Sequence, residues 1–375
     1  MKIRSAVLHS MDAKTPFAET KPLRIEELDL DEPGPGEVLV KMVAAGLCHS
    51  DLSVMTGVRP RPVPIALGHE ASARVVRTGP GVSDLQAGDL VVLVFVPSCG
   101  HCMPCAEGRP ALCEPAAETN TDGTLFSGAR RLHLSNYQAV NHHTGVSAFS
   151  DHAVVSRNSC VKVDAPIDPV EAALFGCAVL TGVGAVINTG GIKAGSTAAV
   201  VGLGGVGLCS LLAAVASGAR EVIAVDIHDS KLDIARSLGA TAAYNARDPE
   251  AIEKIRAATK GGVDYAFEMA GAVQSMETAY SITRRGGTTV TAGLPAPTDR
   301  WPFRQLSLVG EERTIKGSYI GSCVPVRDVP RYIGMYLNGK LPINKLMGKR
   351  HTLDQINEGF DRLAGGESLR DVVVF

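Results

Sequence analysis

The stretch from Thr197 to Ala219, TAAVVGLGGVGLCSLLAAVASGA, constrains the fold more than any other part of the chain. It carries no charged residue over a length that would suffice for a membrane-spanning helix. Four glycines interrupt it, however: Gly202, Gly204, Gly205 and Gly207. They divide the run into a short apolar strand, a turn and a helix. The pattern therefore predicts a buried strand and helix, and no membrane span.

The same glycines form a ligand-binding pattern. The segment Gly202–Gly207 reads G-x-G-x-x-G, and a second apolar strand, EVIAVD, ends at Asp226. Such glycines permit a tight turn and let the backbone approach a pyrophosphate, which then lies at the helix N-terminus. An acid at the end of the second strand accepts hydrogen bonds from the ribose hydroxyls and repels a 2′-phosphate. The sequence thus predicts a dinucleotide site that prefers NAD to NADP; the alternative is close packing of helix on strand without a ligand.

Four cysteines in the segment CGHCMPCAEGRPALC form a second local motif. Cys99, Cys102 and Cys105 are spaced C-x2-C-x2-C, and Cys113 follows after seven residues. Zinc prefers four soft ligands at tetrahedral corners, and this spacing lets one loop supply several of them. Four thiolates leave no open position, so the motif predicts a structural zinc site. The alternatives are two disulfides, which a reducing compartment disfavours, and an iron–sulfur cluster.

A third set of candidate ligands is scattered along the chain. Cys48 lies in GLCHSDL, His69 and Glu70 lie in ALGHE, and Cys177 lies in LFGCAVLTGVG. Neighbouring glycines suggest turns, where functional side chains often lie. Spacing alone does not show that these residues converge, because an isolated cysteine is usually a small buried apolar residue.

Length and charge narrow the class of protein. A chain of 375 residues is too long for one small core, so two domains are expected. A net charge of −2, without a basic stripe or polybasic segment, predicts neither nucleic acid nor a membrane surface as partner. The N-terminal residues lack the apolar run and cleavage site of a signal peptide, which predicts a cytoplasmic protein.

Taken in order, these motifs resemble the zinc-dependent medium-chain alcohol dehydrogenases over nearly the whole chain. The resemblance runs from PGPGEVLVKMVAAGLCHSDL through GHEASARVVRTGPGVSDLQAGDLVV and the four-cysteine lobe to GFDRLAGGESLRDVVV. It implies an α/β fold with a mostly-β GroES-like catalytic domain and a Rossmann domain with a doubly wound parallel sheet. The implied boundaries are 1–178 for the catalytic domain, 179–320 for the NAD-binding domain and 321–375 for a segment that returns to the catalytic domain.

The resemblance also assigns metal ligands. It implies two zinc ions per chain: a catalytic zinc on Cys48, His69 and Cys177, with Glu70 in the second shell or as an alternate ligand, and a structural zinc on the four clustered cysteines. Ser50 matches a residue that takes the alcohol's proton, whereas Ser53 stands where many relatives continue the relay with a histidine. Further implied contacts to the cofactor are His49, Thr181, Val206, Lys231 and Arg370. The implied substrate pocket contains Ser50, Phe95, Leu294 and Tyr319.

The activity implied is reversible NAD-linked oxidation of a primary alcohol, medium-chain or aromatic, to the aldehyde. A close subgroup oxidises S-(hydroxymethyl)glutathione, but two of its substrate-binding positions hold Arg59 and Ala117 here, which ranks that activity second. A zinc-free reductase or a non-catalytic NAD-sensing or structural protein would lack some of the zinc ligands. The long segment between Cys113 and Gly145 is like that of dimeric members, which implies a homodimer.

Overall fold

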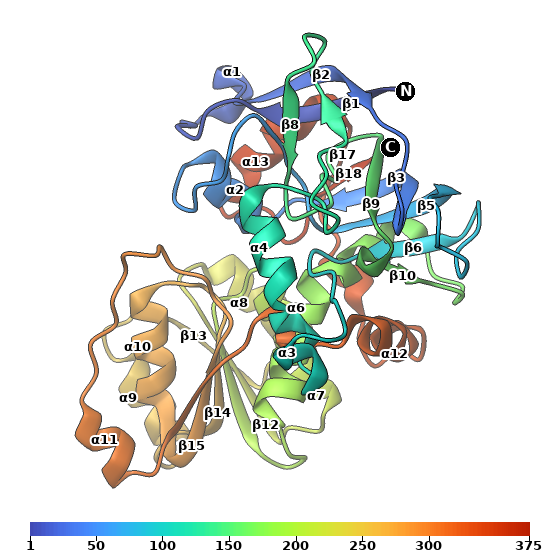
Figure 1. The fold of residues 1–375 in the computed structure, drawn as a ribbon. Coiled ribbons are helices and arrows are strands. Elements are labelled where there is room, and N and C mark those ends of the chain that lie inside the picture. The colour runs from blue at the N-terminus through green and yellow to red at the C-terminus, as the bar shows by residue number, and fades with distance from the viewer. The chain divides into compact units, whose positions relative to one another are not determined.

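The computed structural model describes residues 1–375 and divides into two compact units. The β-rich unit comprises Met1–Cys177, Val324–Gly334 and Asn344–Phe375. The parallel-sheet unit comprises Ala178–Cys323 and Met335–Ile343. Figure 1 labels the elements of both units, which are described separately below.

Two sheets form the β-rich unit. The first is a small closed barrel with strand order β1-β2-β7-β8-β4, and the second has the order β10-β6-β5-β3-β18-β17, with β9 also paired to β3. The barrel strands are β1 (Lys2–Leu8), β2 (Leu23–Leu30), β4 (Ile65–Ala66), β7 (Leu132–His133) and β8 (Ala139–His142). The strands of the second sheet are β3 (Glu37–Gly46), β5 (Ala71–Thr78), β6 (Leu90–Leu93), β9 (His152–Ser156), β10 (Cys160–Lys162), β17 (Arg350–His351) and β18 (Val372–Val374).

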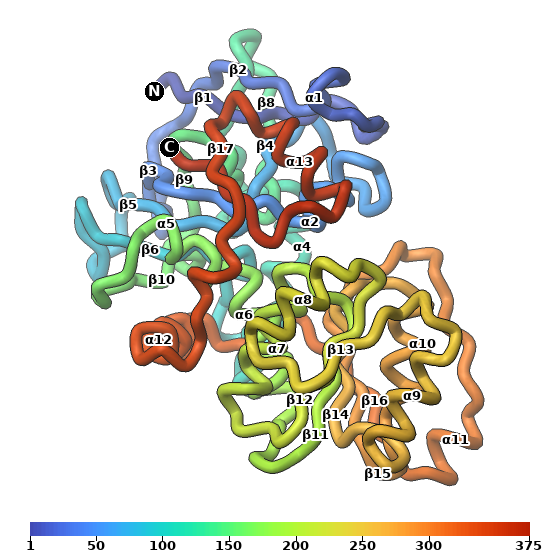
Figure 2. Tube along the Cα trace, turned by 180° about the vertical axis from the view of Figure 1, so that it is seen from behind, coloured from blue at the N-terminus to red at the C-terminus, as the bar shows by residue number.

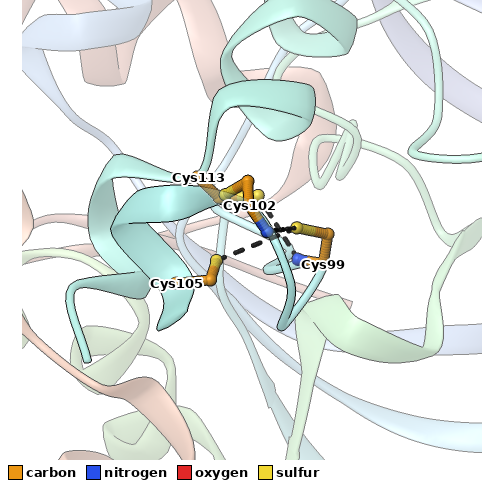
Figure 3. Close-up of side chains that lie close together, drawn as sticks. All are labelled: Cys99, Cys102, Cys105 and Cys113. Carbon is orange, nitrogen blue, oxygen red and sulfur yellow. Dashed lines mark hydrogen bonds between the residues drawn. The ribbon is translucent and has the colours of Figure 1, made fainter. Parts of the chain in front are cut away.

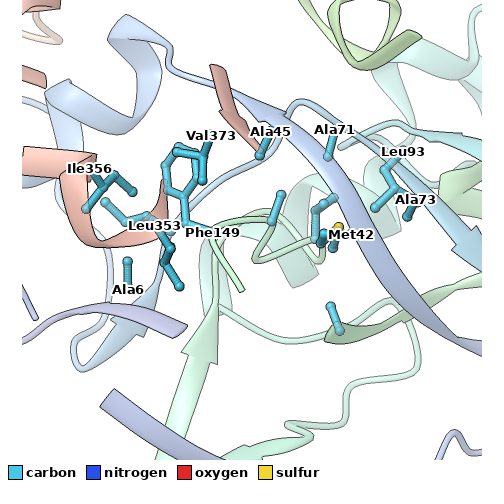
Figure 4. Close-up of a cluster of buried hydrophobic side chains, with 14 of the residues drawn as sticks. Ala6, Met42, Ala45, Ala71, Ala73, Leu93, Phe149, Leu353, Ile356 and Val373 are labelled. Atoms are coloured by element: carbon cyan, nitrogen blue, oxygen red, sulfur yellow. The ribbon is translucent and has the colours of Figure 1, made fainter. Parts of the chain in front are cut away.

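The C-terminal segment completes this unit. Strand β18 runs antiparallel to β3, with Val373 opposite Ala45. Figure 4 shows Val373, Leu353 and Ile356 in one apolar cluster with Phe149 and residues from the N-terminal strands. The unit's helices are α1 (Phe17–Thr20), α2 (His49–Met55), α3 (Met103–Ala106), α4 (Glu114–Asp122), α5 (Pro169–Ala172), α12 (Pro325–Leu337, whose last turn belongs to the other unit) and α13 (Ile356–Ala364).

A six-stranded, entirely parallel sheet forms the second unit, with the order β13-β12-β11-β14-β15-β16. Numbered within the unit, this is the order 3-2-1-4-5-6 of a doubly wound dinucleotide-binding sheet. Its strands are β11 (Thr197–Val201), β12 (Glu221–Asp226), β13 (Ala242–Asn245), β14 (Val263–Glu268), β15 (Thr283–Thr291) and β16 (Thr314–Gly317). Its helices are α6 (Ala178–Gly184), α7 (Gly205–Ala216), α8 (Asp229–Ser237), α9 (Ala251–Ala258), α10 (Val273–Ile282) and α11 (Gln305–Gly310). Helices α9 and α10 lie side by side in Figures 1 and 2. The sheet order and the β-rich unit together confirm the predicted fold class.

The uncharged stretch Thr197–Ala219 folds as predicted. Every residue of β11 is buried, and α7 begins at Gly205 after the glycine turn. No single helix in the structure is long and apolar enough to cross a membrane; one bent helix pair, Pro169–Gly176 with Ala178–Gly190, passes that test by length and composition alone.

One buried imidazole ties the barrel turn to the strand beside it. The ring of His142, at the end of β8, accepts a hydrogen bond at Nε2 from the backbone N–H of Arg131, 3.0 Å away. Burial, with the nearby charges of Arg130 and Arg131, lowers the pKa of His142 to about 3. The folded protein therefore holds this ring neutral at pH values where the unfolded chain protonates it.

His142 should make the protein less stable in mild acid. The pKa of His142 is lower in the folded protein than its value of about 6.5 in the unfolded chain, so its contribution to the free energy of unfolding is complete above about pH 6.5. That contribution declines as the pH falls from about 6.5 toward 3, by at most about 1.4 kcal/mol per pH unit. We expect His142→Asn to lose stability at pH 7.5 but to lose less between pH 7.5 and 5.5 than the wild type. Urea unfolding at both pH values, with the half-buried His9→Asn as control, measures this; equal pH slopes for wild type and His142→Asn would contradict it.

Candidate functional site

The four clustered cysteines converge on one point. Their sulfur atoms all lie within 4.8 Å of one another, and Figure 3 shows them approaching from the loop before α3, from α3 itself and from the start of α4. The sulfurs of Cys99 and Cys105 are 4.0 Å apart. All nine cysteines of the chain are free thiols, so the disulfide alternative is not what the structure shows.

Backbone amides favour the thiolate form of one cysteine in this cluster. The N–H groups of His101 and Cys102 donate to the Cys99 sulfur at 3.4 and 3.2 Å, and these bonds lower the pKa of Cys99 to about 6. Burial raises the pKa of Cys105 to about 12, so this thiol needs a nearby cation to be held as a thiolate. Four convergent sulfurs with amide donors are the donor set of a structural zinc site, and the residues present fit that ion.

The scattered ligand candidates also converge. Ligand atoms of Cys48, His69, Glu70 and Cys177 lie within 4.8 Å of one another, and all four residues are buried. Cys48 precedes α2, His69 and Glu70 lie between β4 and β5, and Cys177 follows the 3-10 turn Ala173–Gly176. All four belong to the β-rich unit.

The His69 ring is arranged as a metal ligand. Its Nδ1 atom lies 3.1 Å from Oδ2 and 3.2 Å from Oδ1 of Asp51, whereas its buried Nε2 atom has no hydrogen-bond partner. Burial opposes a charge on this ring, but Asp51 and Cys48 outweigh it and raise the pKa of His69 well above its usual value. A buried ring nitrogen without a hydrogen-bond partner, in surroundings that favour positive charge, is suited to bind a divalent cation.

Cys48 and Cys177 shift each other's pKa in opposite directions. A hydrogen bond from Cys177 holds the pKa of Cys48 well below its usual value, and the same contact, with burial, raises that of Cys177. Both residues would have to be thiolates to bind a metal, because metal binding requires deprotonated ligands.

Asp51 was missed by the sequence interpretation. It is fully buried on α2, and although burial alone would raise its pKa, the imidazoles of His69 and His143 lower it to about 2. Its place between a metal-ligand histidine and a second histidine is that of a residue that orients the ligand. The signal in the sequence was an acid three residues after Cys48, in GLCHSDL, which by itself fits an ordinary helix N-terminal acid.

Glu70 is held by a cation. Its Oε2 atom accepts a hydrogen bond of 3.1 Å from the buried Arg370, which also donates to the Leu47 carbonyl at 3.2 Å. A Cβ atom on Gly46 would lie 2.9 Å from the Glu70 carboxyl carbon, so any residue other than glycine at this position would displace the Glu70 side chain. Arg370 therefore neutralises Glu70 beside the metal-binding residues, and its contact with a pyrophosphate stays a prediction.

Other predicted residues surround the ligands. The ring of Phe95 meets that of His69 edge-on, with centroids 5.3 Å apart and planes at 88°, and forms an apolar wall there. His49 and the half-buried Ser50 occupy the first turn of α2. The Ser53 hydroxyl donates to the His49 carbonyl at 2.7 Å and accepts from the Arg59 guanidinium at 3.1 Å.

The glycine turn of the parallel-sheet unit has three distinct constraints. Gly202 has φ +93°, where a side chain would be strained, and Gly207 approaches so closely that its Cβ would lie 1.8 Å from the Gly202 carbonyl oxygen. A Cβ on Gly204 would meet nothing within 4 Å, so that side of the turn is open. These are the three roles that the fingerprint requires: the tight turn, the close packing of helix on strand, and room for a pyrophosphate.

The remaining predicted cofactor residues lie near this turn or on the unit's surface. Asp226 ends β12, and its two oxygens accept from the N–H groups of Leu203 (2.7 Å) and His228 (2.9 Å). The helix carrying Thr181 packs on α7, where a Cβ on Gly182 would lie 2.3 Å from the Val206 carbonyl oxygen. Lys231 lies in the first turn of α8. Leu294 and Tyr319, which were predicted to line the substrate pocket, are exposed.

Comparisons with known proteins find relatives along the whole chain. A family profile described as zinc-binding dehydrogenase matches residues 205–338, and one described as alcohol dehydrogenase GroES-like domain matches residues 34–165. The NDMA-dependent alcohol dehydrogenase of Amycolatopsis methanolica is 38% identical over 382 residues, which cover 100% of this chain and 99% of that protein. The crystal structure of benzyl alcohol dehydrogenase from Acinetobacter calcoaceticus is 33% identical with a TM-score of 0.92, covering 100% and 99% of the two chains. That of an alcohol dehydrogenase zinc-binding domain protein from Burkholderia ambifaria is 34% identical with a TM-score of 0.93 and the same coverage.

Removing one sulfur from the lobe should release one metal ion and destabilise the protein. We expect the wild type to contain about two zinc ions per chain and Cys105→Ser to contain about one. The variant should also melt at a lower temperature, because zinc binding contributes roughly 10 kcal/mol or more in model zinc peptides. Elemental analysis and calorimetry check this, with the exposed neighbour substitution Met103→Ala as control. Unchanged zinc content and melting temperature in Cys105→Ser would contradict a structural zinc.

Proposed function

Because this chain belongs to the zinc-dependent alcohol dehydrogenase family, we propose that it oxidises primary alcohols to aldehydes with NAD⁺ as hydride acceptor, using zinc held by Cys48, His69 and Cys177. The observation that carries the proposal is the convergence of two thiols on the partnerless Nε2 atom of His69. Glu70 is engaged by Arg370, which leaves three protein ligands and one open position.

Zinc bound at these residues would supply the Lewis acidity that makes an alcohol hydroxyl easier to deprotonate. The chain's own groups do the rest. Phe95 shields the His69 side of the site, and Arg370 offsets the charge of Glu70. Two thiolates and an imidazole bring the metal site to a net charge near zero.

Ser50 is the proposed proton acceptor. It lies two residues after Cys48, in the first turn of α2, which places it near the cysteine that is proposed to bind zinc. Ser53, where many relatives use a histidine, already donates to the His49 carbonyl and accepts from Arg59. We therefore propose that Ser50 accepts the alcohol's proton while its own hydroxyl proton passes on toward solvent, and that Ser53 does not continue the relay.

NAD⁺ is proposed as the hydride acceptor on the strength of the parallel-sheet unit. The open face at Gly204 suits a pyrophosphate, and the Asp226 carboxylate at the end of β12 would repel a 2′-phosphate. The name of the Amycolatopsis relative raises a second candidate acceptor, NDMA. Recording NADH absorbance with benzyl alcohol and added NAD⁺, and repeating the assay with NDMA, distinguishes the two.

An aromatic or medium-chain primary alcohol is the proposed substrate. The apolar Phe95 ring beside His69 supports it, as does the likeness to a benzyl alcohol dehydrogenase. S-(hydroxymethyl)glutathione ranks second, because Arg59 would repel its amino group and Ala117 offers no cation to its carboxylates. A rate with formaldehyde that depends on glutathione and exceeds the rate with benzyl alcohol would reverse that ranking.

A homodimer is proposed from the exposed edge of the parallel-sheet unit. Strand β16 is the last strand of the sheet, so one side of its backbone is unpaired within the sheet. Nearby α11 exposes Leu306 and Val309, at 82% and 68%. A second copy could cover this strand and helix. Light scattering after gel filtration tests the mass, and a monomer would contradict the proposal.

Ser50→Ala should retain zinc and NAD⁺ yet lose alcohol oxidation most strongly at low pH. General acid–base groups typically contribute about 100- to 10,000-fold, and hydroxide replaces part of the serine's task as pH rises. Measuring kcat/KM from pH 6 to 10 alongside bound zinc tests this, with Ser53→Ala as the matched serine control. Full activity of Ser50→Ala across the range, with zinc retained, would remove Ser50 from the mechanism.

Asp226→Ser should weaken NAD⁺ use and improve NADP⁺ use. The substitution removes the carboxylate that is proposed to bind the ribose hydroxyls and to exclude a phosphate. Because Asp226 also accepts from the N–H groups of Leu203 and His228, serine keeps one acceptor there. The ratio of kcat/KM for the two cofactors is the readout. A wild type that already prefers NADP⁺ would refute the assignment.

A further inference from the structure

We propose that His143 is a positioning residue for the metal site: it holds the Asp51 carboxylate against His69 and so determines how firmly His69 binds zinc. The inference rests on the proposed function only in taking Cys48, His69 and Cys177 as the zinc ligands. Its evidence lies in a second buried imidazole that the sequence interpretation did not assign.

The carboxylate of Asp51 is shared between two rings. Its Oδ1 atom lies 3.0 Å from Nδ1 of His143 and 3.2 Å from Nδ1 of His69. It also accepts from the Gly68 backbone N–H at 3.0 Å. The two rings meet edge-on, with centroids 5.5 Å apart and planes at 87°. Asp51 has no solvent exposure, so these neighbours take the place of water around its charge.

The backbone brings the two histidines together. Strands β4 and β8 run parallel, with Ile65 opposite Asn141 and Ala66 opposite His142, so the residues that follow each strand emerge side by side. The chain after β8 then returns to the chain after β4, where the Ala148 N–H donates to the Gly68 carbonyl at 3.0 Å. His143 therefore occupies its place through the sheet, independently of any ligand.

The turn after His143 is held in an unfavourable conformation. Thr144 has φ +51° and Ser147 has φ +52°, a region that a β-branched residue such as threonine rarely adopts. Such strain persists where the surrounding structure over-determines it, and it is frequent at functional sites. Here it accompanies the turn that presents the His143 ring to Asp51.

Three ionisable side chains face the His143 ring. The groups that face His143 are Asp51 on α2, His69 after β4 and the charged Arg61. Burial and the charges of His69 and Arg61 outweigh Asp51 and lower the pKa of His143. Nδ1 of His143 and Nδ1 of His69 lie 3.0 and 3.1 Å from the Asp51 carboxylate, so the tautomer of each ring with its proton on Nδ1 directs that N–H toward Asp51.

This arrangement has a consequence for the metal. A carboxylate that binds the far nitrogen of a metal-ligand histidine sets that ring's tautomer and orientation, and losing such support typically costs about 10- to 100-fold in metal affinity or activity. With His143 gone, Asp51 keeps only the Gly68 amide and His69, and the carboxylate is free to turn.

The test compares His143→Leu with His143→Asn. The two side chains are similar in size and shape, but only asparagine offers an N–H near the place of Nδ1. His142→Leu is the matched control, because His142 is equally buried on the neighbouring position but pairs with Arg131. The readouts are the rate of zinc loss to a chromogenic chelator and the visible spectrum of cobalt(II) substituted at the catalytic site, with kcat and KM recorded in parallel.

We expect His143→Leu to lose its catalytic zinc about 10-fold or more faster and to shift the cobalt spectrum. His143→Asn should restore both toward the wild type, and His142→Leu should leave both unchanged. Equal defects in the leucine and asparagine variants, wild-type zinc retention and spectrum in His143→Leu, or the same zinc loss in His142→Leu would each overturn the proposal. A wild type without zinc at this site would instead refute the proposed function.

Discussion

The end of strand β3 positions nearly every residue of the metal site. Ala45 is paired with Ala71 of β5, which directly follows His69 and Glu70, and Gly46 is paired with Val372 of β18. Cys48 lies two residues beyond Gly46 on the same strand exit. Side chains alternate between the two faces of a strand, so a slip of one residue at this end of β3 would turn these side chains to the opposite face.

The pairing that joins Ala45 to Ala71 continues across the sheet toward Cys177. Ala71 is paired with Leu93 of β6, and a Cβ on Gly176 would lie 2.3 Å from the Leu93 carbonyl oxygen. Only a glycine allows this approach, and it places Cys177 beside residues that are more than a hundred positions earlier in the chain. Phe95, two residues after Leu93, reaches the His69 ring from this side.

Charge balance explains which polar groups surround the ligands. Cysteine and carboxylate groups that are buried without water need nearby positive charge. Arg370 supplies it to Glu70, the His69 ring forms a hydrogen bond with Asp51, and Nδ1 of His143 lies 3.0 Å from the same carboxylate. The remaining demand at Cys48 and Cys177 fits a divalent cation. In the Cys99–Cys113 lobe two backbone amides donate to the Cys99 sulfur, and the remaining demand of the four sulfurs again fits a cation.

The sequence by itself determined the features whose residues are neighbours along the chain. The four-cysteine lobe closes within one loop, and the glycine turn needs only its own backbone and the strand on either side, so spacing was sufficient to predict both. The fold class followed from the alternation of strands and helices and from the resemblance that these motifs carry. Residue spacing did not show that Cys48, His69 and Cys177 meet, although the resemblance implied it, and the tertiary structure brings them together. The tertiary structure alone decided that Arg370 faces Glu70 and that Asp51 lies between two histidines. Those contacts depend on sheet register and on the parallel pairing of β4 with β8, which join segments far apart in sequence and leave no periodic signal in the chain.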